Sequence, residues 1–373
     1  MDGGMSGVLS LPAALCTRAQ RQADDFTART GVVLDAAELV GGRAALLGLA
    51  ARGRTSAGGA TRLLRGIDAW CAVTLSRPDD IDAVAALVQV DTMHSDPWAA
   101  VQGWVAHRSA AEAVARAQLL GIPAAVLGET PAAPPRVAPL GPRRAPGAPL
   151  LVADLSSMWA GPLCGQLLHR SGATVVKVES PARPDGTRRG PTPFFDWMNR
   201  GKLSYAVDFD DDAQIRALLS AADVVIEGSR PAALQRRRLG PSDIAARDGR
   251  VWLRITGYGT EGDAAARVAF GDDAAVAGGL VENDTSGPAF VGDAIADPLT
   301  GLHAATAVAD SLARGGGELI EISMAATAAG YAPFVGGARR EPPIPQDGPA
   351  AARLGIDNAA VRSLVTERLS LTC

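Results

Sequence analysis

The sequence predicts an α/β protein built on a doubly wound, mostly parallel, Rossmann-like sheet, with a second, smaller α+β domain. The main observation is a series of short apolar runs in the second half of the chain, at 150–156, 174–180, 204–209, 223–229 and 251–257. Segments with helical period separate these runs, and strands that alternate with helices form right-handed βαβ units. With 373 residues the chain is long enough for two compact domains.

A change of composition divides the chain. Residues 130–149 are dense in Pro and Gly, which is typical of a linker. Before them, helical patterns cover 13–52 and 110–120, and strand-like runs lie around Arg62 and at 70–75. We therefore expect an α+β region at 1–129, a linker at 130–149, an α/β domain at 150–330 and a tail at 331–373.

Composition argues against several classes of protein. The formal net charge of −4 gives no electrostatic footprint for nucleic acid. No apolar stretch is long enough for a membrane helix, and no signal peptide is recognisable, so we expect a cytoplasmic protein with no membrane partner. The four cysteines (Cys16, Cys71, Cys164 and Cys373) are scattered, which favours reduced thiols over disulfides, and no ligand cluster indicates a metal.

Ligands of such sheets bind beyond the carboxyl ends of the strands. The first run of the α/β region ends in Trp159 and Ala160, followed by Gly161 and Pro162, which suits a helix start that approaches an anion or an ordinary turn. The fourth run ends in Ser229 and Arg230, followed by arginines at 236–238, and the fifth ends in Gly257, Tyr258 and Gly259. An arginine cluster there can hold phosphates, although most charge runs are solvated helix faces.

The most informative segment is 292–305. Asp293 and Asp297 lie in an otherwise small and apolar stretch before a predicted helix. Asp297 precedes Pro298, so one interpretation is a helix N-cap. The other is a covalent nucleophile, because a carboxylate held at a buried helix start can attack an electrophile.

Read together, these motifs resemble the class III CoA-transferase family of the CaiB–BaiF type, which includes formyl-CoA and carnitine-CoA transferases and α-methylacyl-CoA racemases. The matching residues occur in family order and cover about residues 150–325: ADLSSMWAGPLCGQLL, ATVVKVES, NRGKLSYAVDF, ADVVIEGSRPAAL, RRLG, ITGYG, ADPLTGLHAA and ELIEISM. Each motif is loose, but the set is specific.

The resemblance implies a CoA-transferase that moves CoA between an acyl-CoA and a carboxylic acid. Asp297 would attack the thioester, giving an aspartyl anhydride and then an aspartyl-CoA thioester. Met158, Trp159 and Ala160 would line the thiol arm of CoA. Ser229, Arg230 and Arg238 would contact its nucleotide, with Gly257, Tyr258 and Gly259 at the same edge. CoA thioester is then a co-substrate, with no tightly bound cofactor and no metal.

The chain departs from the family pattern in its order. Pieces similar to the family's small domain precede residue 150, and the tail resembles the family's closing segment. The predicted α/β region would therefore be the CoA-binding domain, preceded by the small-domain-like region. Gly58 and Gly59 are a candidate for the glycine-rich active-site loop. Because family members form interlocked dimers, the resemblance also implies a homodimer.

Two other functions stay open. An α-methylacyl-CoA racemase needs a base on each face of the α-carbon, and Phe270 and Gly271 occupy the positions where the family's racemases have a His-Asp pair. Asp272 and Asp273 are near in sequence, and His303 follows Asp297 by about two helical turns. The second alternative is a CoA-binding homologue that has lost catalysis.

Overall fold

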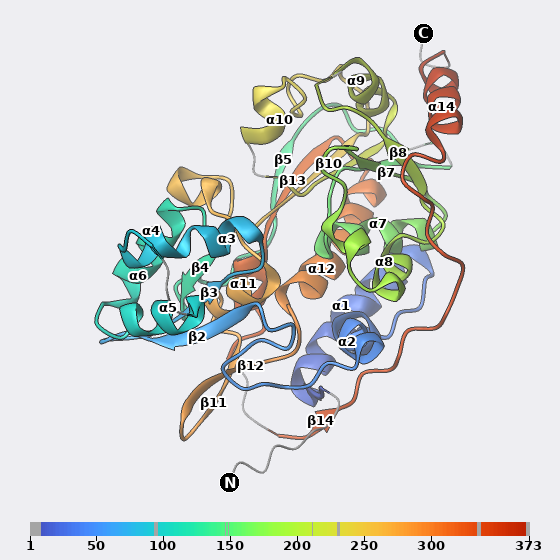
Figure 1. Cartoon of the computed structure of the whole chain (residues 1–373). Helices are drawn as coiled ribbons and strands as arrows, with labels where there is room; N and C mark the ends of the chain where they lie inside the picture. Colours follow the sequence, from blue (N-terminus) through green and yellow to red (C-terminus); the bar gives the residue numbers. More distant parts are fainter. Residues whose placement is uncertain are drawn as a thin grey trace.

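The computed structural model describes residues 9–92, 96–145, 147, 149–210, 212–229, 232–333 and 337–370. Its largest element is a seven-stranded sheet in the order β5-β13-β10-β9-β6-β7-β8 (Figure 1). The strands are β5 (Arg136–Pro139), β6 (Leu151–Asp154), β7 (Thr174–Glu179), β8 (Leu203–Ala206), β9 (Val224–Glu227), β10 (Val251–Thr256) and β13 (Glu318–Ser323). All neighbours pair in parallel except β5, which pairs antiparallel with β13. This confirms the predicted mostly parallel sheet.

Alternate residues of the strands enter two separate cores, one on each face of the sheet. Val152 and Val224 pack into one core, and their neighbours Leu151 and Val225 pack into the other. Helices therefore cover both faces, as a doubly wound sheet requires. The first core includes α1 (Ala13–Thr30), α2 (Ala36–Leu47), α7 (Ala160–Arg170), α8 (Thr192–Asn199) and α12 (Ala296–Ala313); the second includes α9 (Asp212–Ala221), α10 (Ala232–Arg236) and α14 (Asn358–Ser370).

A smaller α+β unit follows the first two helices in the chain. Its antiparallel sheet has the order β2-β3-β4 and packs against short helices around a core of its own (Figure 1). The elements are β2 (Thr61–Arg65), β3 (Trp70–Thr74), α3 (Pro78–Asp82), α4 (Val84–Val88), α5 (Pro97–Val105), α6 (Ala110–Leu119) and β4 (Ala124–Val126). The strands predicted around Arg62 and at 70–75, and the helix predicted at 110–120, are confirmed.

Packing does not follow the expected sequence boundaries everywhere. α1 packs against α12 of the large unit, so the first fifty residues extend the helical layer of the large sheet. Within residues 130–149, β5 forms the edge strand of that sheet. Between the two units lie α11 (Gly271–Ala277), the hairpin of β11 (Val281–Asp284) and β12 (Gly287–Phe290), and α13 (Met324–Ala329). The division into four segments stays a prediction.

The tail after α13 follows the outside of the molecule. β14 (Arg339–Arg340) pairs with β1 (Leu11–Pro12), and α14 packs against β8 and α9, so the described part of the tail reaches the large sheet (Figure 1). Two 3-10 helices, Gly186–Arg189 and Gly262–Ala266, lie in loops of the α/β region.

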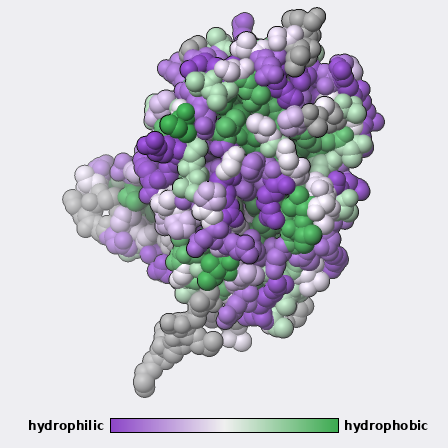
Figure 2. All heavy atoms as spheres, turned by 90° about the vertical axis from the view of Figure 1, so that its right-hand side faces the viewer, coloured by the Kyte–Doolittle hydropathy of each residue, from purple (hydrophilic) through white to green (hydrophobic). Residues whose placement is uncertain are grey.

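The remaining global features concern surface and thiols. No helix in the described ranges is long and apolar enough to span a membrane. On the face that carries the tail, hydrophilic residues predominate and apolar side chains form separate patches (Figure 2). Cys16, Cys71 and Cys164 are buried free thiols, and Cys373 lies outside the described residues.

Candidate active site

Three predicted ligand loops lie at one edge of the large sheet. Residues 158–160 follow β6, Ser229 follows β9, and residues 257–259 follow β10. β6, β9 and β10 are neighbouring parallel strands, so their carboxyl ends lie side by side. The tertiary structure therefore brings together segments that are a hundred residues apart in sequence.

A buried ion pair fixes the loop after β6. The Met158 amide donates to both carboxylate oxygens of Asp185, at 3.2 Å, while Met158 has a positive φ of 74°. Lys177 Nζ lies 2.7 Å from Asp185 Oδ2 and donates to the Ser156 carbonyl at 2.6 Å. Burial opposes ionisation of Asp185, but Lys177 and the hydrogen bonds from Thr187 together outweigh burial and hold the pKa of Asp185 below its usual value. Met158 is 39% exposed, at the surface of this edge.

The second lysine of the chain fixes the start of α7. Lys202 Nζ donates to Asp154 Oδ2 at 3.0 Å and to the carbonyl of Pro162, in the first turn of α7, at 2.8 Å. Both side chains are buried. Gly165 leaves the space, since a Cβ there would lie 2.8 Å from Asp154 Oδ2. The turn from β6 into α7 is thus held by two buried ion pairs, Lys177–Asp185 and Lys202–Asp154.

Asp297 lies in the first turn of α12 and faces the start of α7. Its carboxylate accepts a hydrogen bond from the backbone N–H of Ala160. Gly301, one turn later on α12, allows the two helices to approach, because a Cβ there would lie 2.6 Å from the Ala160 carbonyl oxygen. Gly271 lies against the carboxylate itself: its Cβ would be 2.4 Å from Asp297 Oδ2. The side chain is therefore positioned at the edge where the sheet loops meet.

Asp297 belongs to a cluster of acidic side chains with altered pKa values. Burial and the nearby Asp272 raise the pKa of Asp297 to about 7, despite the Ala160 hydrogen bond. Burial and Asp293 raise the pKa of Asp272 to about 6, and burial raises that of Asp273 to about 7. Carboxyl groups with such pKa values in one place are typical of functional sites. At neutral pH a large fraction of Asp297 is ionised.

Asp272 and Asp273 are held by hydrogen bonds from several segments. The Ala294 amide donates to Asp272 Oδ1 at 2.9 Å, and the Thr61 hydroxyl donates to its Oδ2 at 3.3 Å. The Tyr258 hydroxyl donates to Asp273 Oδ2 at 3.1 Å. These two carboxyls therefore join α11 to the small sheet and to the loop after β10.

Arg43 is the cation of this cluster. It extends from α2, and its Nη1 lies 2.5 Å from Asp293 Oδ2. Burial raises the pKa of Asp293, and Arg43 opposes that rise. Gly58 lies beside the same carboxylate, because a Cβ on Gly58 would be 3.8 Å from Asp293 Oδ1. The predicted glycine loop thus borders the acidic cluster.

The residues predicted to bind the nucleotide of CoA differ in exposure and in their contacts. Ser229 is partly buried at the end of β9, and its hydroxyl donates to Glu227 at 3.4 Å. Arg238 is exposed. Arg230 lies outside the described residues. Tyr258 directs its hydroxyl to Asp273, with the Arg267 guanidinium over its ring at 3.5 Å, so its side chain supports the cluster.

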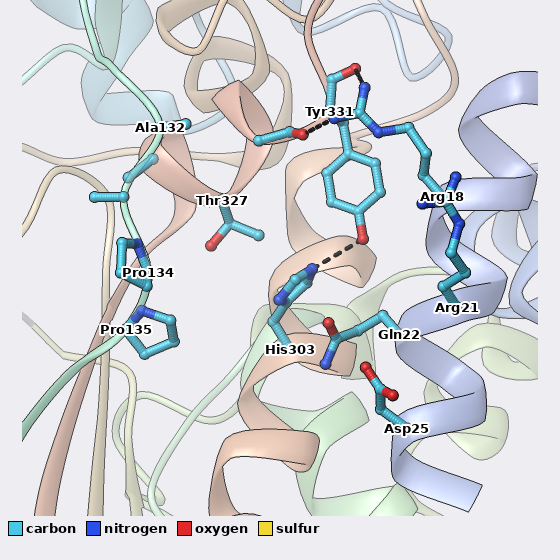
Figure 3. A pocket seen from close by; sticks show the side chains of 13 residues that line it. Arg18, Arg21, Gln22, Asp25, Ala132, Pro134, Pro135, His303, Thr327 and Tyr331 are labelled. Atoms are coloured by element: carbon cyan, nitrogen blue, oxygen red, sulfur yellow. Dashed lines mark hydrogen bonds between the residues drawn. The ribbon is translucent and has the colours of Figure 1, made fainter.

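His303 lies in a pocket that is separate from the acidic cluster around Asp297. Its Nε2 is 2.9 Å from the Tyr331 hydroxyl, in a pocket of about 450 Å³ between α1, α12 and residues 132–135 (Figure 3). Burial lowers its pKa to about 4. Arg18 also lines this pocket and donates a hydrogen bond to the Tyr331 carbonyl at 3.0 Å. Asp297 and His303 are six residues apart on α12, a spacing that places them on different faces of the helix.

Comparison with known proteins places the chain in a family. The model for CoA-transferase family III matches residues 148–361, more than half of the chain. The chain belongs to CoA-transferase family III. The match begins just before β6 and includes the turn into α7, Asp297 and α12, whereas α1, α2 and the small sheet precede it.

Individual relatives cover part of this family III chain. Succinyl-CoA–D-citramalate CoA-transferase of Chloroflexus aurantiacus is 29% identical over 46% of this chain and 48% of its own length. Human alpha-methylacyl-CoA racemase is 32% identical over 30% of this chain and 28% of its own. The crystal structure of a hypothetical protein from Mycobacterium tuberculosis aligns with a TM-score of 0.46 and 29% identity, over 51% of this chain and 57% of that one. The chain spans about half, or less, of the curated relatives it matches.

Several site residues were not anticipated. Arg43 gave no signal in the sequence, because it lies in a helical segment a hundred residues before the recognisable motifs. Lys177 and Lys202 are the two lysines of a chain rich in arginine, and that rarity was a usable signal. Within the described ranges, no group of three or more acidic, histidine or cysteine side chains is arranged to hold a metal ion.

Proposed function

We propose that this family III protein transfers CoA from an acyl-CoA to a carboxylic acid, with Asp297 as the covalent nucleophile. The observation that carries the proposal is the position of Asp297, in the first turn of α12, bonded to the Ala160 N–H at the ligand edge of the sheet. The name of the Chloroflexus relative, a CoA-transferase acting on small organic acids, supports the same reaction class.

The chemistry takes two pairs of steps. The Asp297 carboxylate attacks the thioester carbonyl, which forms a mixed anhydride and breaks the carbon–sulfur bond to release CoA thiolate. The thiolate then attacks the aspartyl carbonyl, giving an aspartyl-CoA thioester and the free donor acid. The acceptor carboxylate attacks this thioester to form a second anhydride and thiolate. Attack of the thiolate on the acceptor carbonyl yields the new acyl-CoA and restores the Asp297 carboxylate.

The surroundings of Asp297 suit a nucleophile. A pKa of about 7 leaves the group substantially ionised at neutral pH while making it more basic than an ordinary carboxylate. The Ala160 N–H and the close approach of Gly271 restrict its orientation. Positioning against a bound thioester lowers the barrier by several kcal/mol in general.

Coenzyme A would approach from the carboxyl ends of the strands. We assign Met158, Trp159 and Ala160 to its thiol arm, and Ser229, Arg230 and Arg238 to its nucleotide. Gly257 and Gly259 border the same edge. Gly58 and Gly59 would cover the reacting group. The cytoplasmic location, the homodimer and the absence of a tightly bound cofactor or metal stay predictions.

Racemisation of an α-methylacyl-CoA is the second candidate. The cluster of Asp272 and Asp273 beside Gly271, together with the racemase relative, favours it. Against it, Asp272 already accepts hydrogen bonds from Ala294 and Thr61, and His303 lies in another pocket. Loss of α-deuterium from labelled 2-methylacyl-CoA would establish racemase chemistry.

The test is exchange of isotope-labelled acid into acyl-CoA. We expect Asp297→Ala and Asp297→Asn to abolish exchange while CoA-thioester binding stays within about threefold of wild type. Asp82→Ala, an exposed carboxylate in the small unit, is the matched control and should keep full activity. Mass analysis of the peptide with Asp297 should detect the CoA adduct in the wild type. Full turnover in Asp297→Ala would refute the nucleophile, and a wild type without exchange or adduct would favour the inactive homologue.

A further inference from the structure

Arg43 comes from a different part of the sequence than the aspartates of the candidate site. It lies on α2, in the part of the chain that the family III match does not cover. Its guanidinium carbon is 5.8 Å from the centre of the Trp159 ring and 5.2 Å from that of Phe194. Trp159 immediately precedes Ala160, whose N–H binds Asp297. The N-terminal helical segment thus delivers a positive charge to the reacting edge of the sheet.

The acceptor of the proposed reaction is an anion, and the site is strongly acidic. Asp272, Asp273, Asp293 and Asp297 lie together, and their mutual repulsion contributes to the raised pKa values. A carboxylate entering this place has to overcome the same repulsion. An arginine offers five N–H donors in a plane, a geometry suited to bidentate carboxylate binding.

The Arg43 guanidinium is accessible enough to bind a second carboxylate in addition to Asp293. Its Nη1 binds Asp293, whose side chain is 1% exposed, whereas the Arg43 side chain is 25% exposed. The ion pair is therefore buried on the aspartate side and open on the arginine side. The rings of Trp159 and Phe194 hold the guanidinium in place, which reduces the entropy lost when a ligand binds.

We propose that Arg43 binds the carboxylate of the acid substrate and so makes the N-terminal helical segment part of the acid-binding site. This assignment rests on the proposed function for its catalytic meaning. It identifies the second substrate by chemistry, as an organic acid bound in its anionic form next to Asp297. Asp293 orients Arg43 and is a positioning residue.

A purely structural role for Arg43 makes a different prediction. If Arg43 serves only to neutralise buried Asp293, its loss is harmful because an uncompensated carboxylate remains, and removing that charge as well should restore the protein. If Arg43 binds the acid, removing Asp293 does not restore acid binding. The double variant Arg43→Gln/Asp293→Asn therefore separates the two roles.

The experiment measures binding of succinate by calorimetry in the presence of CoA, and the KM for succinate in exchange with succinyl-CoA. We expect Arg43→Gln to weaken both by about 10- to 100-fold, the usual worth of a charge-assisted hydrogen bond. Arg43→Lys should fall in between. Asp293→Asn should weaken both less than Arg43→Gln does, because the orienting carboxylate is lost while the guanidinium stays, and the double variant should behave like Arg43→Gln. Arg29→Gln, an exposed arginine of α1 paired with Asp310, controls for net charge.

The calorimetric arm does not require turnover, so it separates this proposal from the proposed reaction. Recovery of succinate binding in the double variant overturns the proposal, as does unchanged binding in Arg43→Gln or no binding of millimolar succinate to the wild type. If succinate binds through Arg43 but the wild type forms no Asp297 adduct, the acid site stands and the proposed reaction fails. Urea unfolding of each variant verifies that it is folded.

Discussion

Replacing Gly271 with alanine tests the geometry of the candidate nucleophile without changing any charge. Gly271 begins α11 and is buried. A Cβ at this position would lie 2.2 Å from the Ala294 carbonyl oxygen and 2.4 Å from Asp297 Oδ2. Ordinary van der Waals contact begins at 3.4 Å, so these oxygens must move by about 1 Å to accommodate the methyl group. The movement is applied directly to the carboxylate that is proposed to attack the thioester.

A displacement of about 1 Å in a reacting group typically costs about 100-fold in rate. Overpacking of this kind also lowers the free energy of unfolding by about 1–3 kcal/mol. We therefore expect Gly271→Ala to remain folded, with acid exchange into acyl-CoA reduced about 100-fold and formation of the Asp297 adduct slowed by the same factor. Steady-state exchange and urea denaturation measure the two effects.

The matched control is Gly103→Ala. Gly103 is a helical glycine in α5, exposed, with no atom within 4 Å of an added Cβ. This substitution should leave exchange unchanged and stabilise the protein by up to about 1 kcal/mol, because alanine is the better helix former. The reasoning is refuted if Gly271→Ala retains exchange within about threefold of wild type and an unchanged free energy of unfolding.

Three further predictions concern ionisation and the loop after β6. Burial raises the pKa of Asp297 from 3.8 to about 7, so the folded protein holds a proton that the unfolded chain releases. The free energy of unfolding should therefore fall as pH rises from about 4 to 7. In Asp297→Asn this fall should be shallower by up to about 1.4 kcal/mol per pH unit. Denaturant titrations at several pH values measure the slope, and equal slopes in the wild type and the variant would contradict the raised pKa of Asp297. The rate of formation of the Asp297 adduct should increase as pH rises through about 7, since only the ionised carboxylate attacks the thioester. Quenched-flow mass spectrometry at constant ionic strength measures this rate, and a rate that does not change with pH would contradict the prediction. Asp185→Asn breaks a buried ion pair with Lys177, so the free energy of unfolding measured in urea should fall by about 3–5 kcal/mol. The double variant Asp185→Asn/Lys177→Met should recover part of this stability. A fall below about 1 kcal/mol in Asp185→Asn would contradict the role of this ion pair.

Predictions from the sequence were most successful where local pattern has a single structural interpretation. The apolar runs at 151–154, 174–179 and 251–256 are strands of the parallel sheet because each is buried on both faces. β5 was missed, since Arg136–Pro139 has a Pro-rich sequence and exposed side chains. Its pairing with β13 is set by backbone hydrogen bonds, which leave no hydrophobic pattern.

Some residues of the candidate site were likewise predicted from local motifs, and others were not. Asp297 and the turn at 158–160 were predicted because their motifs occur in a recognisable order. Arg43 and Asp185 were not predicted. Arg43 acts through Asp293, 250 residues away in sequence, and a contact over such a separation has no local signature. Asp185 is only 8 residues from Lys177 and 27 from Met158, but it acts by joining two loops of the sheet edge, and that arrangement leaves no periodic pattern.

The sequence by itself determined the doubly wound sheet, the smaller α+β unit and the position of the candidate nucleophile Asp297 at a helix start, because strand burial and helix starts depend on neighbouring residues. Only the tertiary structure decided that α1 and α2 pack on the large unit, and that Arg43 of α2 pairs with Asp293 and lies near Asp297 at the sheet edge. The physical reason is that both contacts depend on packing between helices far apart in sequence. The close crossing of α7 and α12, allowed at Gly301 by the absence of a side chain, brings Asp297 to the Ala160 N–H, and the packing of α2 brings Arg43 to Asp293.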